Sequence, residues 1–166
     1  MNRLTAAAAI GAALLAAAPA AFAAEYATVK LDTTVNAPID QVWAKVGGWC
    51  AIKDWLPRLA PCAMTGDGGL GSVRKLGAQG AITEVMVAQT KYSYTYAQPT
   101  NPGLGILYHG TLSAEPIDRT HTKLMYTVVW DDEPDGDQAA KDKDKAQRSG
   151  SFTGALAAMK ALVEGK

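Results

Sequence analysis

The sequence has 166 residues, and its 16 basic and 16 acidic side chains give a formal net charge of zero. This balance gives no electrostatic basis for a nucleic-acid or membrane-surface partner, and we expect neither. The length suits one domain with a substantial hydrophobic core, and the absence of repeats argues against a second domain.

The first 23 residues have the pattern of a secretory signal peptide. Arg3 precedes an uncharged Ala/Leu run from Leu4 to Ala18, which ends in small residues. These 15 residues are fewer than the about 20 that a spanning helix needs, so we expect removal rather than a stable membrane anchor. The motif Ala21-Phe22-Ala23 places cleavage after Ala23, with Ala24 as the alternative. The mature domain, residues 24–166, is then expected to be periplasmic or secreted.

The domain begins with a predicted strand and two short helices. Apolar and polar residues alternate from Tyr26 to Val35, which is the period of a half-buried strand. After Pro38, apolar residues recur at helical spacing until Gly47-Gly48 ends the helix. A second short helix fits residues 49–55, because Pro57 forbids its continuation.

Six further strands and a long helix are predicted for the remainder. Segments rich in β-branched and aromatic residues follow one another between turn signals: CAMTG, SVRKL, AITEVMVAQ, KYSYTYA, GILYHGTLSAEPI and HTKLMYTVVW. The spacing of apolar residues in 138–164 predicts one helix, on which Phe152, Leu156 and Met159 should face the sheet. We therefore predict an α+β fold, in which a curved antiparallel sheet of about seven strands wraps around the C-terminal helix.

Several motifs occur in order along this domain: APIDQVWAKVGGWCAIKDWLP, GSVRKL, ITE, YSYTY, and YTVVWDD before a C-terminal helix. Together they resemble the START/Bet v 1-like (SRPBCC) superfamily, in particular its bacterial polyketide cyclase/dehydrase-like branch. The resemblance covers nearly all of residues 24–166. It implies a helix-grip fold with an apolar cavity between sheet and long helix. Because this superfamily includes lipid carriers, hormone receptors and cyclases, the resemblance specifies fold more than function.

Residues 42–62 contain three of the four tryptophans and both cysteines. A cavity lined by one sheet needs a cover, and large aromatic side chains on the short helices suit that position. Trp43 fits an ordinary core position, whereas Trp55 is the better candidate for a gate. Cys50 and Cys62 are twelve positions apart, and an oxidising compartment favours a disulfide over two buried thiols or a catalytic pair.

Arg74 and Glu84 lie in successive predicted strands around the turn GAQG, so hairpin pairing can bring them together. The spacing leaves open an exposed cross-strand ion pair or a charged pair that faces the cavity. The resemblance favours the cavity, where buried charges need partners.

Tyr92, Tyr94 and Tyr96 share one face of a predicted strand. They form part of a cavity wall if that face is concave, and a surface stripe if it is convex. The resemblance implies that Tyr94 and Tyr108 point inward. We also include Trp130, from the motif YTVVWDD, among the ligand-binding candidates.

Gly150 and Gly154 lie on one face of the long predicted helix. Each costs roughly 1 kcal/mol relative to alanine, which suggests that another group approaches the backbone there. Both close packing on the sheet and pocket volume beside Gly154 fit this spacing.

Three other patterns do not indicate a site. GDGGLG, residues 66–71, matches a dinucleotide-binding motif, but a strand rather than a helix follows it. His109 and His121 show no metal-ligand spacing. The run DDEPDGDQAAKD resembles a calcium loop, but Asp142 stands where glutamate is needed and no helix precedes it. We therefore expect no metal and no cofactor.

These observations lead to hypotheses from different functional classes. The first is a periplasmic carrier or sensor, which binds a small apolar molecule through Trp55, Arg74, Glu84, Tyr94, Tyr108, Trp130 and Gly154. The second is a cyclase- or dehydratase-type enzyme, in which Glu84 is the general acid or base while Arg74 and a tyrosine hold a ligand oxygen. The third is an accessory protein of another periplasmic system. The oligomeric state stays open.

Overall fold

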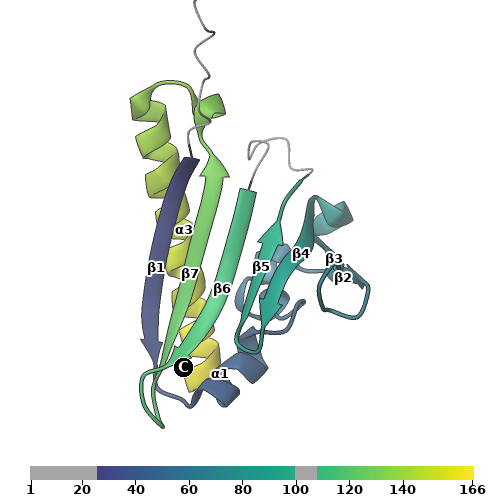
Figure 1. Cartoon of the computed structure of the whole chain (residues 1–166), viewed down its shortest axis with the longest axis vertical. Helices are drawn as coiled ribbons and strands as arrows, with labels where there is room; N and C mark the ends of the chain where they lie inside the picture. Colours follow the sequence, from purple (N-terminus) through teal and green to yellow (C-terminus); the bar gives the residue numbers. More distant parts are fainter. Residues whose placement is uncertain (1–25, 100–107) are drawn as a thin grey trace, which may run out of the picture.

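The computed structural model describes residues 26–99 and 108–166, in which an antiparallel sheet packs against one long helix (Figure 1). The strands are β1 (Tyr26–Val35), β2 (Cys62–Thr65), β3 (Val73–Leu76), β4 (Ile82–Thr90), β5 (Ser93–Ala97), β6 (Tyr108–Pro116) and β7 (Thr122–Asp131). The α-helices are α1 (Ile39–Val46), α2 (Ile52–Trp55) and α3 (Gln138–Glu164). Three short 3-10 turns are η1 (Pro57–Leu59), η2 (Ala78–Gly80) and η3 (Glu133–Asp135). The predicted signal peptide lies outside the described residues.

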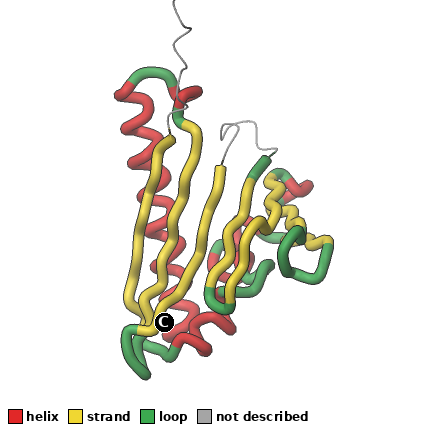
Figure 2. Tube along the Cα trace, in the orientation of Figure 1, coloured by secondary structure: helices red, strands yellow, loops and turns green. Residues whose placement is uncertain are grey.

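The strand order across the sheet is β1-β7-β6-β5-β4-β3-β2, and every neighbouring pair is antiparallel. The consecutive strands β1 and β2 therefore form opposite edges, and the connection that carries α1 and α2 crosses between them. Figure 2 shows that the helices gather on one side of the sheet. This arrangement confirms the predicted α+β helix-grip fold.

One face of the sheet is buried and points toward α3. On β7, Leu124, Tyr126, Val128 and Trp130 are buried while the residues between them are half-exposed. The Tyr126 ring lies 4.6 Å from the Phe152 ring of α3, measured between centroids. Successive side chains of a strand point to opposite faces of the sheet. Burial of one residue therefore determines which of the strand's other side chains share its buried face.

This rule also decides the side of the β5 tyrosines, which the sequence left open. Tyr94 and Tyr96 are only 1% and 2% exposed. Tyr94 pairs with Leu112 of β6, which is itself buried. The tyrosine face is therefore concave and part of the interior.

Helix α3 has the predicted bounds. Its first turn is capped by Asp137, whose side chain accepts a hydrogen bond from the Ala140 amide at 2.9 Å. Leu156 and Met159 are buried against the sheet, and Phe152 is half-buried, as the apolar stripe predicts. Over residues 26–99 and 108–166, no helix combines the length and apolarity needed to cross a bilayer.

The second helix is shorter than predicted. The sequence suggested a helix over residues 49–55, but α2 begins only at Ile52. The carbonyl of Trp49 accepts a hydrogen bond from the Arg74 side chain instead of joining a helical ladder. A long-range contact has therefore replaced the first turn of the helix.

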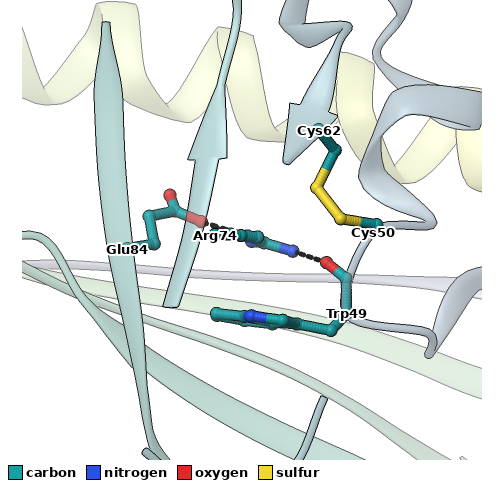
Figure 3. Close-up of a disulfide and its surroundings, with 5 residues drawn as sticks. All are labelled: Trp49, Cys50, Cys62, Arg74 and Glu84. Carbon is teal, nitrogen blue, oxygen red and sulfur yellow. Dashed lines mark hydrogen bonds and ion pairs between the residues drawn. A yellow bond between two sulfur atoms is a disulfide. The ribbon is translucent and has the colours of Figure 1, made fainter. Parts of the chain in front are cut away.

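A disulfide between Cys50 and Cys62 confirms the predicted pairing, with Cα atoms 5.7 Å apart (Figure 3). The bridge closes a loop that contains α2 and η1, and it connects Cys50, two residues before α2, to Cys62, the first residue of β2. This loop is therefore held at both ends beside the sheet.

Candidate functional site

A cavity of about 380 Å³ lies between the sheet, α3 and the disulfide-closed loop. This volume is within the range of small-molecule sites. The loop contributes Ile52, Leu56, Arg58 and Leu59. The sheet and the residue after β5 contribute Ile82, Glu84, Tyr96, Gln98, Tyr108 and Tyr126. Helix α3 contributes Asp144, Gln147, Arg148, Ser151, Phe152 and Ala155.

A buried ion pair lies beside this cavity. Arg74 and Glu84 are direct partners in the register of β3 and β4, and the Arg74 Nε donates to Glu84 Oε2 at 2.5 Å. The guanidinium carbon lies 3.9 Å from the centroid of the Trp49 ring, and the Trp49 carbonyl accepts from Nη1 (Figure 3). The two side chains are 0% and 3% exposed. Burial opposes the charge of Arg74, but the surrounding phenols and Glu84 outweigh it and raise its pKa.

Glu84 is held on both sides of its carboxylate. While Oε2 accepts from Arg74, Oε1 accepts from the Gln98 amide at 2.6 Å. Charge-assisted hydrogen bonds of this kind are short and directional. The carboxylate is therefore oriented by two fixed donors, and it faces the cavity with its charge already compensated.

Three phenols form a polar part of the lining. The hydroxyls of Tyr96 and Tyr126 are 3.0 Å apart, and either can donate. Burial raises the pKa of Tyr108 to about 12, and it raises the pKa values of Tyr96 and Tyr126 well above the ordinary value for tyrosine. All three are consequently protonated at neutral pH and present hydrogen-bond donors rather than charges.

The position of Tyr96 depends on Gly110 of β6. A Cβ atom at residue 110 would lie 2.3 Å from both Cζ and the hydroxyl oxygen of Tyr96. The Tyr96 ring therefore crosses directly over the glycine backbone. Sequence analysis did not single out Gly110, although an isolated glycine within a strand is a signal of close approach.

Arg148 of α3 lies over the aromatic residues of the last two strands. Its guanidinium carbon is 4.7 Å from the Trp130 ring centroid and 5.5 Å from that of Tyr108. The Arg148 Nε also donates to Asp144 Oδ2 at 2.5 Å, one turn earlier on the helix. Sequence analysis missed this pair, although a spacing of four residues on a helix is the usual signal for it.

The predicted site residues separate into two groups. Glu84 and Tyr108 line the cavity. Arg74, Tyr94 and Trp130 are buried next to it but are not part of its lining. Arg74 reaches the cavity only through Glu84, so the structure corrects the expectation that its side chain faces the cavity directly.

Trp55 does not occupy the expected gate position. The side chain is 2% exposed and belongs to the hydrophobic core, while Ile52 and Leu56 of the same segment line the cavity. Helical spacing places Ile52, Trp55 and Leu56 on one side of the segment, so the packing of the neighbouring elements decides which of them reach the cavity. Trp55 is part of the hydrophobic core instead.

Gly154 also lies elsewhere than expected. It is exposed, and no atom lies within 4 Å of the position that a Cβ would take, at Gly154 or at Gly150. Neither close packing on the sheet nor cavity volume accounts for these glycines. The cavity instead receives Ala155, which the helical rotation of 100° per residue places on the adjacent face.

The described residues contain no group of three or more His, Cys, Asp or Glu side chains that could hold a metal ion. His121 lies near the turn between β6 and β7, where its Nδ1 is 2.9 Å from Asp118 Oδ2. It therefore belongs to a surface turn and is not among the residues of the cavity lining.

Comparison with known proteins gives one family and many structural matches. The family described as polyketide cyclase/dehydrase and lipid transport matches residues 26–164. No curated protein sequence matches significantly.

Among solved structures, the Zhui aromatase/cyclase of Streptomyces sp. R1128 has a TM-score of 0.67 at 22% identity, covering 84% of this chain and 94% of that chain. Norcoclaurine synthase from Thalictrum flavum, in complex with dopamine and hydroxybenzaldehyde, has a TM-score of 0.63 at 17% identity, with coverage of 84% and 87%. Ara h 8.0201 has a TM-score of 0.62 at 17% identity, with coverage of 86% and 100%. At these identities the matches establish a common Bet v 1-like fold.

Proposed function

The chain belongs to the polyketide cyclase/dehydrase and lipid transport family, and we propose that it is a periplasmic binding protein for a small hydrophobic molecule. The ligand would occupy the cavity between the sheet, α3 and the disulfide-closed loop. The observation that carries this proposal is a preformed cavity of about 380 Å³, with apolar side chains from all three walls and a few fixed polar groups. Such a lining binds an apolar body and orients its polar end.

The polar groups are better suited to orientation than to proton transfer. Glu84 is engaged by Arg74 and Gln98 through both of its oxygens. These two donors fix the orientation of the carboxylate, as a group that positions a ligand requires. The binding function is therefore our first proposal.

A cyclase-type activity is the second candidate. The observation in its favour is that Glu84 and the phenols of Tyr96 and Tyr108 meet in one cavity. Two structural matches are named as an aromatase/cyclase and a synthase. In such an enzyme, Glu84 would exchange a proton with the substrate after releasing one of its two donors, while a protonated phenol stabilised a substrate oxygen.

Titration with the neutral fluorescent probe N-phenyl-1-naphthylamine tests the binding proposal. We expect saturable binding, which Ser151→Phe weakens at least about tenfold because Ser151 lines the cavity. Ala157→Phe is the matched control, since Ala157 is exposed on the same helix and outside the lining. Equal affinity in both variants would reject the cavity as the binding site.

Mass spectrometry of molecules that copurify with the protein would distinguish carrier from enzyme. A carrier should retain a hydrophobic compound that it returns unchanged, and Glu84→Gln should not alter its chemical identity. Conversion of the compound by the wild type, but not by Glu84→Gln under conditions where that variant is folded, would support the enzyme.

The periplasmic location is part of the proposal and has its own test. When the full chain is expressed in a bacterium with a Sec pathway, the exported protein should lack residues 1–23 or 1–24. A full-length protein retained in the cytoplasm would contradict export.

A further inference from the structure

One charged residue of the cavity lining has no partner within the part of the chain that the structure describes. The charged side chains that line the cavity there are Arg58, Glu84, Asp144 and Arg148. Glu84 is paired with Arg74 behind the lining, and Asp144 is paired with Arg148. Arg58 makes no hydrogen bond or ion pair with any other residue in the described ranges. The cavity therefore carries one uncompensated positive charge.

Arg58 lies where the cavity opens to solvent. It is exposed although it lines the cavity, and it belongs to η1, directly after Pro57. Proline fixes the backbone at the start of this turn, and the disulfide closes the loop that contains it. The base of the side chain is thus held at the opening, while the guanidinium is free to meet a group that enters.

Several apolar residues share the cavity lining with Arg58. Leu56 and Leu59 of the same loop line the cavity, and Phe152 of α3 also lines it. A ligand that contacts these side chains with its body would bring one end to the guanidinium. A planar guanidinium presents paired N–H donors that match the two oxygens of a carboxylate.

We propose that the ligand is an amphipathic carboxylate, with its apolar body inside the cavity and its carboxylate bound by Arg58 at the opening. This inference rests on the proposed binding function and names the chemical class of the ligand. Arg58 is the specificity-determining residue, because it separates a hydrophobic acid from the corresponding neutral alcohol.

A competition experiment tests this assignment with N-phenyl-1-naphthylamine as the bound reporter. Decanoate and decanol have the same chain length and differ in charge, so their displacement constants isolate the contribution of the carboxylate. We expect decanoate to displace the probe from the wild type at a roughly threefold to tenfold lower concentration than decanol. This preference should decrease with added salt, because the charge pair is partly exposed.

Two variants of Arg58 and one control variant connect the preference to this residue. Arg58→Met should remove the preference for decanoate, measured within each variant as the ratio of the decanoate and decanol displacement constants. Lys53→Met removes the same charge from an exposed position in the same loop that is outside the lining, so it should keep the preference. Arg58→Lys should retain part of it through charge alone.

The outcomes separate the two proposals. If the probe does not bind the wild type, the binding function itself is rejected. If the probe binds but decanoate and decanol compete equally, or if Lys53→Met and Arg58→Met have equal effects, the binding function stands and the assignment of Arg58 is overturned.

Discussion

Arg74 and Glu84 are cross-strand partners whose side chains form an ion pair almost completely removed from solvent. The pair is accompanied by the Trp49 carbonyl on one side and Gln98 on the other. It therefore joins two strands of the sheet to the segment in front of α2. Arg74 and Gln98 also hold the Glu84 carboxylate in a defined orientation at the cavity.

Removing one member of this pair should be strongly destabilising. We expect Arg74→Met and Glu84→Gln each to cost about 3–5 kcal/mol of unfolding free energy, because each leaves an uncompensated buried group. The double variant should lose much less unfolding free energy than the sum of the losses of the two single variants. Urea denaturation of all four proteins measures this coupling, and additive single effects would show that the ion pair is not the stabilising unit.

Replacing both cysteines by alanine should destabilise the protein by about 3 kcal/mol, since the bridge closes a short loop in the unfolded chain. The same loop carries Ile52, Leu56 and Leu59 of the cavity wall. We therefore also expect weaker binding of N-phenyl-1-naphthylamine by the variant under conditions where it is folded. Unchanged affinity would mean that packing alone positions this wall.

Gly110→Ala should disturb the cavity from the sheet side. The new methyl group would overlap the Tyr96 ring, so the ring must shift, and we expect this to weaken the Tyr96–Tyr126 hydrogen bond. Overpacking of this kind costs about 1–3 kcal/mol. Gly154→Ala is the control, because its Cβ meets open space on a helix and should stabilise by up to about 1 kcal/mol. Thermal unfolding that ranks the two variants in the opposite order would contradict this account.

We expect Glu164, at the end of α3, to make the stability of the folded protein depend on pH. Its Oε1 accepts from the Asn36 amide at 2.9 Å and lies 3.3 Å from the Lys160 ammonium, while Oε2 lies 3.0 Å from that of Lys166. The Asn36 hydrogen bond, followed by the lysine contacts, lowers the pKa of Glu164 from 4.5 to about 2. A carboxyl group whose pKa is lower in the folded state than in the unfolded state stabilises the folded protein. This stabilisation is complete above the unfolded-state pKa, and it is lost as the pH falls toward the folded-state pKa.

We therefore expect Glu164→Gln to be less stable than the wild type by a constant amount above about pH 5. The difference should shrink as the pH falls from 4.5 to about 2, where the wild-type carboxylate takes up its proton. Urea midpoints measured across this range provide the test. If the stability difference between the wild type and Glu164→Gln did not change with pH, the charge of Glu164 would not be its cause.

The sequence by itself determined the order and the approximate bounds of the elements. Strand β1 and helix α3 begin and end where the residue pattern predicts, since alternation with period two and apolar spacing near 3.6 are local properties. The Cys50–Cys62 pairing was also predicted, because spacing and redox compartment leave few alternatives for two cysteines. The resemblance supplied the helix-grip arrangement of these elements.

Only the tertiary structure decided which side chains meet at the cavity. Glu84 and Gln98, or Tyr108 and Arg148, come from segments whose distance in space no local pattern specifies. The predicted roles of Trp55 and Gly154 differed for the same reason, because each helix has several faces and the packing of its neighbours selects the one that is buried. Even the start of α2 depended on Arg74, a residue two strands away, whose side chain takes the carbonyl that a local helix would have used.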